Sequence, residues 1–158
     1  MATKPSADTE VAEFAGQLFF RLWRASHTRT AEALESIGLT PALFGLLNVL
    51  GVRDGAIQLE LATTMGIDPS TLVSLVDELE SAGLAKRRPH PNDRRAREVT
   101  ITAKGRRLLE RGRRMAFQVE DEVLRGLTTA ERRELLTLLR RALSSAPPQS
   151  PWTAEEGD

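Results

Sequence analysis

The chain has 158 residues, no cysteine, and 22 basic and 22 acidic side chains, which give a formal net charge of zero. This length fits one compact domain, and the absence of cysteine excludes disulfides, thiolate metal sites and thiol redox switches. No stretch approaches the roughly 18 unbroken apolar residues of a membrane span, and residues 1–10 lack the apolar run of a secretory signal. We therefore expect a cytoplasmic protein with no membrane partner.

The first expected element is a long helix over residues 10–37 with apolar side chains on two faces. One face carries a stripe of five apolar residues and the other carries three aromatic residues: Val11, Phe14, Leu18, Leu22 and Ala25; and Phe19, Phe20 and Trp23. A small domain covers one face of such a helix with its own core, so the second face predicts that two copies of the chain pair as a homodimer. Residues 1–9 are expected to be disordered.

Three shorter helices follow, and the last two of them form a helix-turn-helix. Thr40-Pro41 is a cap followed by proline at the first helical position, which predicts a buried helix that ends at Gly51. A helix over residues 58–65 stops at Gly66, which begins the turn 66–68. Asp68-Pro69 repeats the cap-plus-proline signal and starts a helix over residues 69–82 that Gly83 terminates. Two helices joined by so tight a turn are typical of the helix-turn-helix.

A basic hairpin comes after the helix pair. Residues 84–88 and 97–101 have the length and alternation of strands, with Val99 and Ile101 on the inward face. The segment 89–93 between them is rich in proline, asparagine and aspartate, which are typical turn residues. The sequence therefore predicts a two-stranded wing.

Two further helices and a tail complete the chain. Thr102 caps a helix to about residue 125, and residues 128–131 form a capping box for a helix to about residue 143. We expect a single domain over residues 10–146, with dimerisation helices at 10–37 and 115–145, a winged helix-turn-helix at 40–102, and a disordered acidic tail at 147–158.

Positive charge is concentrated in one segment although the whole chain is neutral. Between Lys86 and Arg114 there are twelve basic and three acidic residues, a net charge of +9, so the rest of the chain sums to −9. A concentrated positive field attracts a polyanion. We expect the wing and the start of the helix after Thr102 to supply most of the electrostatic attraction for a nucleic acid.

The helix over residues 69–82 presents a hydroxyl-rich outer face. We expect four apolar residues on its buried stripe and three hydroxyl residues outward near its first turn: Leu72, Leu75, Val76 and Leu79; and Ser70, Thr71 and Ser74. Free backbone N–H groups and the helix dipole at that end favour a phosphate, and the second helix of such a motif normally enters the major groove of DNA. Arg94 and Arg95 in the hairpin suit a narrow minor groove, which attracts arginine without base-specific hydrogen bonds.

Three stretches of this region carry a recognisable pattern. They run from Asp68 to Leu84, from Arg87 to Arg97 and from Val99 to Gly105, and the triplet Leu39-Thr40-Pro41 also fits. Together they resemble the multiple antibiotic resistance regulator (MarR) family of bacterial winged-helix repressors. The resemblance implies a homodimeric transcription factor whose recognition helices enter major grooves of a pseudo-palindromic operator and whose wings reach minor grooves.

The resemblance also implies roles for individual residues. In that family an Asp-x-Arg motif at the wing tip supplies the arginine that enters the minor groove, so Asp93-Arg94-Arg95 gives this role to Arg95, with Asp93 bracing the tip. The implied fold is mainly α with a small β-hairpin wing and N- and C-terminal dimerisation helices. The candidate DNA-binding residues are Pro69, Ser70, Thr71, Ser74, Lys86, Arg88, Asp93, Arg94, Arg95 and Arg97.

A small effector is a further candidate partner. Many members of this family bind an anionic aromatic compound between the dimerisation helices and the winged helix, and an effector releases DNA to the extent that it prefers a spacing that DNA does not accept. Phe19, Trp23 and His27 are the candidate effector-binding residues, although aromatic residues at helical spacing are also typical of a core or a dimer interface. The sequence predicts no cofactor and no metal site.

The chain has few of the side-chain groups that catalysis requires. A nucleophile needs an adjacent base, yet the chain has no cysteine, and its two histidines, His27 and His90, lack metal-ligand spacing. We therefore do not expect an enzyme. The alternative to a DNA-binding regulator is a winged-helix module that binds a protein partner, because the helix over residues 69–82 has no basic residue and three acidic ones: Asp77, Glu78 and Glu80.

Overall fold

The computed structural model describes residues 14–90 and 96–145. Its elements in chain order are α1 (Ala15–Glu35), α2 (Pro41–Val52), β1 (Ala56–Ile57), α3 (Gln58–Met65), α4 (Pro69–Ser81), β2 (Ala85–Pro89), β3 (Arg97–Ile101), α5 (Ala103–Val123) and α6 (Thr129–Ser145). The fold is mainly α with one small antiparallel sheet, as the sequence predicts. The termini expected to be disordered, at 1–9 and 147–158, lie outside the described residues. Within the described ranges no helix is both long enough and apolar enough to cross a bilayer.

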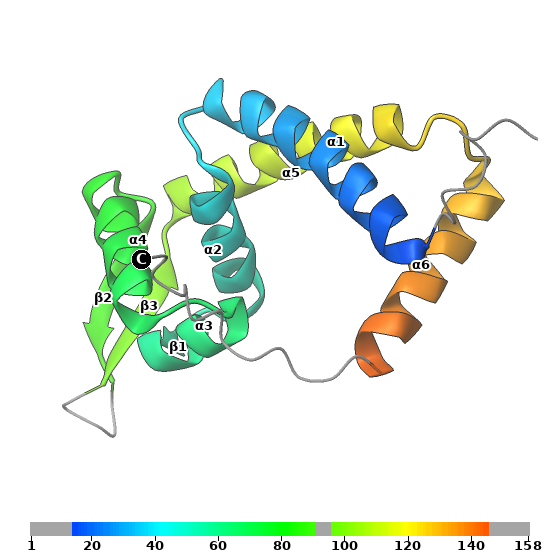
Figure 1. Cartoon of the computed structure of the whole chain (residues 1–158). Coiled ribbons are helices and arrows are strands. Elements are labelled where there is room, and N and C mark those ends of the chain that lie inside the picture. The colour runs from blue at the N-terminus through cyan, green and yellow to red at the C-terminus, as the bar shows by residue number, and fades with distance from the viewer. Residues whose placement is uncertain (1–13, 91–95, 146–158) are drawn as a thin grey trace, which may run out of the picture.

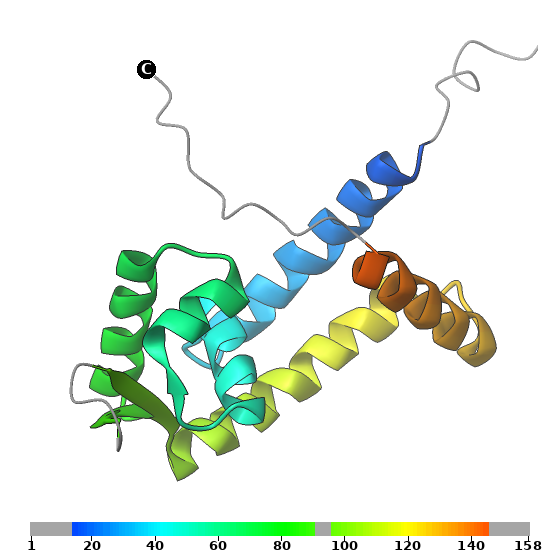
Figure 2. The same cartoon turned by 90° about the horizontal axis from the view of Figure 1, so that it is seen from below.

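Figure 1 shows two regions. A winged-helix body contains α2, α3, α4 and the sheet, and a helical scaffold of α1, α5 and α6 extends away from it. α5 joins the two regions, because it starts at the base of the wing and continues as one helix across residue 115. α1 packs against α5, which it crosses in Figure 1, and Figure 2 shows both helices extending away from the body. Arg29 Nη1 of α1 lies 3.1 Å from Glu122 Oε2 of α5.

Two helices of the body begin at the predicted caps. Thr40 Oγ1 accepts a hydrogen bond from the Leu43 N–H at 3.2 Å, and Asp68 accepts from two N–H groups of the first turn of α4. Proline occupies the first position of both helices, where a missing N–H costs nothing. Gly66 and Gly83 follow α3 and α4 with φ of +65° and +70°, the left-handed conformation that glycine adopts without strain.

Gly51 has a different role from the one predicted. α2 ends at Val52, so Gly51 lies inside the helix and does not terminate it. A Cβ at Gly51 would stand 2.7 Å from Leu109 Cδ2 of α5, and a Cβ at Gly112 would stand 2.8 Å from Phe44 Cε2 of α2. These two glycines therefore permit the close packing of α2 against α5.

The sheet has one more strand than the predicted hairpin. β1, β3 and β2 lie side by side in that order, all antiparallel, with Ala56 paired to Val99 and Ile57 paired to Glu98. The prediction missed β1 because a strand of two residues is too short to show an alternating pattern. β1 leads directly into α3, so it fixes the base of the helix-turn-helix to the wing.

The core lies between the helices of the body and the sheet. Its most deeply buried large side chains are Leu34, Leu39, Leu46, Leu47, Leu50, Leu61, Leu72, Leu79, Leu109, Val76 and Val99. The inward direction of Val99 and Ile101 is confirmed, and three of the four residues predicted for the buried stripe of α4 are buried. The fourth, Leu75, is half-buried against the same core.

Neither apolar face of α1 is covered by the chain itself. Phe14 is 61% exposed and Trp23 56% exposed, and Leu34 alone among the described residues of α1 is buried. The expectation that the chain's own core covers one face is wrong for residues 14–25, because an open hollow of about 740 Å³ separates this end of α1 from α5. α6 likewise has no buried residue along its described length, and Leu143 is 70% exposed.

Candidate nucleic-acid interface

α4 presents the polar outer face that the sequence predicts. Its apolar stripe packs into the core, which turns the opposite side outward. The exposed residues of α4 are Pro69, Ser70, Thr71, Val73, Ser74, Asp77, Glu78 and Ser81. Ser81 was missed by the sequence reasoning, although it follows Ser74 by two helical turns and so lies on the same face.

The first turn of α4 is occupied by its own cap. Asp68 Oδ1 accepts hydrogen bonds from the N–H groups of Ser70 at 2.8 Å and Thr71 at 3.1 Å. The hydroxyls of Ser70 and Thr71 also donate to this carboxylate, and together with the Thr71 N–H they hold the pKa of Asp68 well below its usual value. The expectation that these N–H groups are free is wrong, because they already donate to the Asp68 carboxylate.

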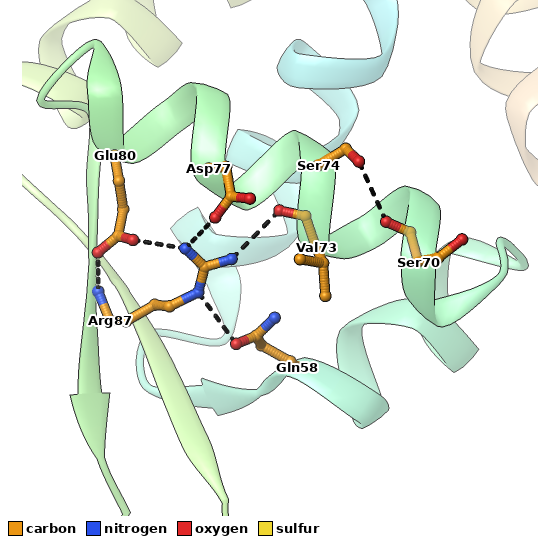
Figure 3. A network of polar contacts seen from close by, with 7 residues as sticks. All are labelled: Gln58, Ser70, Val73, Ser74, Asp77, Glu80 and Arg87. Atoms are coloured by element: carbon orange, nitrogen blue, oxygen red, sulfur yellow. Dashed lines mark hydrogen bonds and ion pairs between the residues drawn. The ribbon is translucent and has the colours of Figure 1, made fainter.

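Ser74 projects from the middle of α4, as Figure 3 shows. Its hydroxyl donates to the Ser70 carbonyl oxygen at 3.3 Å, which is longer than a typical hydroxyl hydrogen bond. Of the three predicted hydroxyl contacts, Ser74 is therefore the least committed to partners within the chain.

The wing brings exposed cations to the side of α4. Lys86 and Arg88 lie on one face of β2 and Arg97 lies at the start of β3, and all three are exposed. Pro89 of β2 pairs with Arg97 of β3, so both strands continue toward the tip of the wing. The predicted tip residues Asp93, Arg94 and Arg95 lie outside the described residues.

Arg87 is the residue of the wing that the sequence reasoning missed. Its side chain turns toward α4, where Nη1 lies 2.5 Å from both Asp77 Oδ1 and Glu80 Oε2 (Figure 3). Burial alone would lower the pKa of Arg87, but the hydrogen bonds that Arg87 donates to Glu80 and Asp77, and the negative charges of these two residues, outweigh burial and raise it. The alternation of the strand could have revealed the inward direction of Arg87. Arg87 follows the buried Ala85 by two residues, so both side chains lie on the same face of β2.

The basic segment from Lys86 to Arg114 does not form one surface. Figure 1 shows that β2 and β3 extend in one direction and α5 in another. Within α5, Arg106 lies 2.5 Å from Asp54 and Arg113 lies 3.0 Å from Glu110. Asp54 and Glu110 thus offset part of the positive charge of α5. The cations that lie beside α4 are those of the wing.

The candidate effector residues come together on the scaffold. The ring centroids of Trp23 and His27 are 4.8 Å apart in a stacked arrangement. Both line a hollow of about 450 Å³ with Phe19 and with Leu139 of α6. This hollow lies on the uncovered part of α1, so its position fits an effector site and a dimer interface equally well.

Comparisons with known proteins place the fold. A model of the MarR family matches residues 37–96. A putative transcriptional regulatory protein for the hcr operon from Thauera aromatica is 33% identical over 144 residues, which are 85% of this chain and 87% of that protein. The transcriptional repressor CouR, solved with a 23-mer DNA duplex, is 31% identical with a TM-score of 0.77, covering 89% of this chain and 99% of that one. A variant of MarR from E. coli solved with operator DNA is 26% identical with a TM-score of 0.72, covering 88% and 99%.

These matches extend over both regions of the molecule. The body matches the family model, and the relatives also align with most of the scaffold helices. The resemblance in the sequence is confirmed: the chain belongs to the MarR family of transcriptional regulators.

Proposed function

We propose that this chain is a homodimeric regulator that binds a pseudo-palindromic DNA site and acts as a transcriptional repressor. The observation that carries the proposal is the exposed outer face of α4 beside a wing that carries three exposed cations, Lys86, Arg88 and Arg97. A helix fits the major groove, and a wing at its side reaches the phosphates and the adjacent minor groove. CouR is a repressor solved with a DNA duplex and E. coli MarR is solved with operator DNA, which supports the same role here.

In this proposal, α4 and the wing make different kinds of contact with DNA. The first turns of α4 supply shape and hydroxyl contacts to the bases and backbone, through Pro69, Ser70, Thr71 and Ser74. The wing supplies most of the electrostatic attraction, through Lys86, Arg88, Arg94, Arg95 and Arg97, with Asp93 bracing the tip. Because α4 itself has no basic residue, we expect affinity to depend on the wing more than on the recognition helix.

The uncovered scaffold supports the dimer. The large apolar residues exposed on its three helices are Phe14, Leu18, Phe19, Phe20, Leu22 and Trp23 of α1; Phe117 of α5; and Leu136, Leu138 and Leu143 of α6. An apolar surface of this extent on three helices marks an interface. A second copy would cover it by two-fold pairing and present two copies of α4 to one duplex.

The first experiment is a selection from a randomised duplex library with the purified full chain, followed by a mobility-shift titration at stated salt. We expect a selected site with two half-sites about one helical turn apart, 34 to 36 Å, because each copy of the dimer places one α4 in a major groove. Retention of no duplex even at low salt would contradict the proposal and favour the alternative, a winged-helix module that binds a protein.

A salt titration then tests which cations contact phosphate. Replacing Arg94 and Arg95 by alanine should flatten the slope of log K against log[salt] by about 1 to 2 units per subunit. The matched control replaces Arg107 and Arg111, two exposed arginines of α5, and should leave the slope unchanged. An unchanged slope in the wing variant would contradict the role of the wing.

The hollow beside Trp23 is where we propose that an anionic aromatic effector binds and releases DNA. Trp23 fluorescence reports this directly in a Trp152→Phe background, because the chain has only two tryptophans. In a screen of phenolic acids we expect a saturable change that is weakened in His27→Ala, which keeps the Trp23 reporter but alters the hollow, together with weaker binding of the selected duplex. Saturable quenching with no change in DNA affinity would contradict an effector role.

A further inference from the structure

Arg87 of the wing binds the carboxylates of two of the three acidic residues on α4, Asp77 and Glu80. We infer that Arg87 is a positioning residue for DNA binding: it fixes β2 against α4 and keeps the carboxylates of Asp77 and Glu80 turned sideways, away from the groove-facing side. This inference rests on the DNA-binding function proposed above and adds to it a residue that contacts α4 and not the duplex.

The guanidinium of Arg87 already has partners on two helices (Figure 3). Nη1 lies 2.5 Å from oxygens of Asp77 and Glu80, and Nη2 donates to the Val73 carbonyl at 3.1 Å. Nε donates to Gln58 Oε1 of α3 at 3.1 Å. A guanidinium has five N–H donors, and these bonds use the Nε donor and both terminal nitrogens, which leaves little capacity for a phosphate.

The backbone of Arg87 belongs to the same contact. Its N–H donates to Glu80 Oε1 at 2.6 Å, while Glu80 Oε2 accepts from the side chain. Glu80 therefore binds the wing strand at two points, and the Arg87 side chain is only 20% exposed. This contact ties the orientation of the wing to that of α4, so a change in Arg87 alters where the wing cations lie.

The carboxylates explain why a positioning residue is needed. Asp77 and Glu80 sit on the flank of α4 that faces the wing, and Figure 3 shows both directed at the guanidinium. Without Arg87 they would be unpaired anions beside a polyanion, and like charges repel. Glu78, the third acid of α4, forms no ion pair within the described part of the chain and therefore serves as a comparison.

Arg111 of α5 is the matched control, because it carries the same charge but is not among the residues that we assign to DNA contacts. It is exposed and has no ion pair within residues 14–90 and 96–145. Arginine and lysine carry equal charge, but lysine lacks the fork that reaches several acceptors at once. A lysine substitution thus removes the positioning contact at residue 87 while preserving the charge at both positions.

The test measures affinity of the full chain for the duplex recovered in the selection above. We expect Arg87→Lys to weaken binding about 10-fold or more and Arg111→Lys to change it less than about 2-fold, because only Arg87 needs the fork. Circular dichroism at the assay temperature confirms that each variant is folded. Equal effects of the two lysine variants would overturn the inference.

A second set of variants separates positioning from general loss of stability. The affinity lost through Arg87→Met should be at least about three-fold smaller when Asp77→Asn and Glu80→Gln are also present, since no unpaired carboxylate then remains. Replacing Glu78→Gln instead should leave the loss unchanged. Losses that are the same in both backgrounds would identify Arg87 as a direct phosphate contact. Failure of the unaltered chain to bind any duplex would instead refute the proposed function.

Discussion

The winged-helix body and the helical scaffold place their apolar residues in opposite ways. In the body, Leu46, Leu47 and Leu50 of α2 are fully buried by the other elements of the same chain. In the scaffold, Phe19 and Phe20 of α1 are more than half exposed. One chain is therefore sufficient to complete the body, whereas the scaffold needs a second surface to bury its apolar side chains.

The strongest test of the body is a substitution at its junction with α5. A Cβ at Gly105 would overlap the Leu84 carbonyl oxygen and stand 2.9 Å from Ile101 Cγ1, and this backbone oxygen is held by a hydrogen bond from the Thr102 N–H at 3.0 Å. We expect Gly105→Ala to lower the free energy of unfolding by about 3 kcal/mol, measured by urea denaturation. The control is Gly126→Ala, where a Cβ meets no atom within 4 Å. A loss below that of the control would contradict this packing.

The corresponding test of the scaffold concerns association. Phe20→Glu places a charge on the apolar face of α1 and should raise the dimer dissociation constant at least about 30-fold, or about 2 kcal/mol, in sedimentation experiments. Leu59→Glu is the control, because Leu59 is also exposed, at 65%, but lies on the body. If both variants dissociated equally, or neither did, the contrast between the two regions would fail.

A smaller effect is expected where the body meets the start of α5. Asp54 accepts a hydrogen bond from the Ile101 N–H at 3.0 Å and lies 2.5 Å from Arg106. We expect Asp54→Ala to destabilise the chain by about 1 kcal/mol, chiefly through the lost bond to the backbone of β3. Arg106→Ala, which removes only the exposed ion pair, should cost less in the same thermal unfolding measurement. The reverse order would be evidence against this explanation.

The smallest effect is the acid sensitivity of one helix cap. The pKa of Asp68 is lowered in the folded chain, so its cap stabilises the fold above about pH 4, the ordinary value for aspartate, and is lost as the pH falls toward the lowered pKa. Asp68→Asn should flatten the fall in unfolding free energy below pH 4. Glu131 of α6, whose pKa is lowered by the N–H and hydroxyl of Thr128, should act in the same direction. Identical acid profiles of the parent and Asp68→Asn would rule out this linkage.

Local signals in the sequence were sufficient for most of the body. Caps such as Thr40 and Asp68, and glycine terminators such as Gly66 and Gly83, act through bonds within a few residues, so the helix boundaries there are confirmed. The wing was predicted because its strands are long enough to alternate. These features do not depend on what the rest of the chain does.

The features that escaped prediction depend on contacts between distant residues. β1 exists because its two residues pair with β3, and Gly51 is needed because α5 approaches α2. The partners of Arg87 lie on α3 and α4, so its role is visible only when strand and helix are brought together. The apolar faces of α1 were predicted from the helical pattern, but the pattern does not show whether the same chain or a second one covers each face.

The continuity of α5 has a mechanical consequence. Its 21 residues form a rod about 31 Å long that is seated at one end beneath Leu84, where Gly105 allows direct contact with the backbone. If that rod pivots as a rigid body by about 5° around its far end, the end beneath Leu84 moves by about 3 Å. A rearrangement of the distant helices that tilts α5 would therefore displace the base of the wing by a distance comparable to the length of a hydrogen bond.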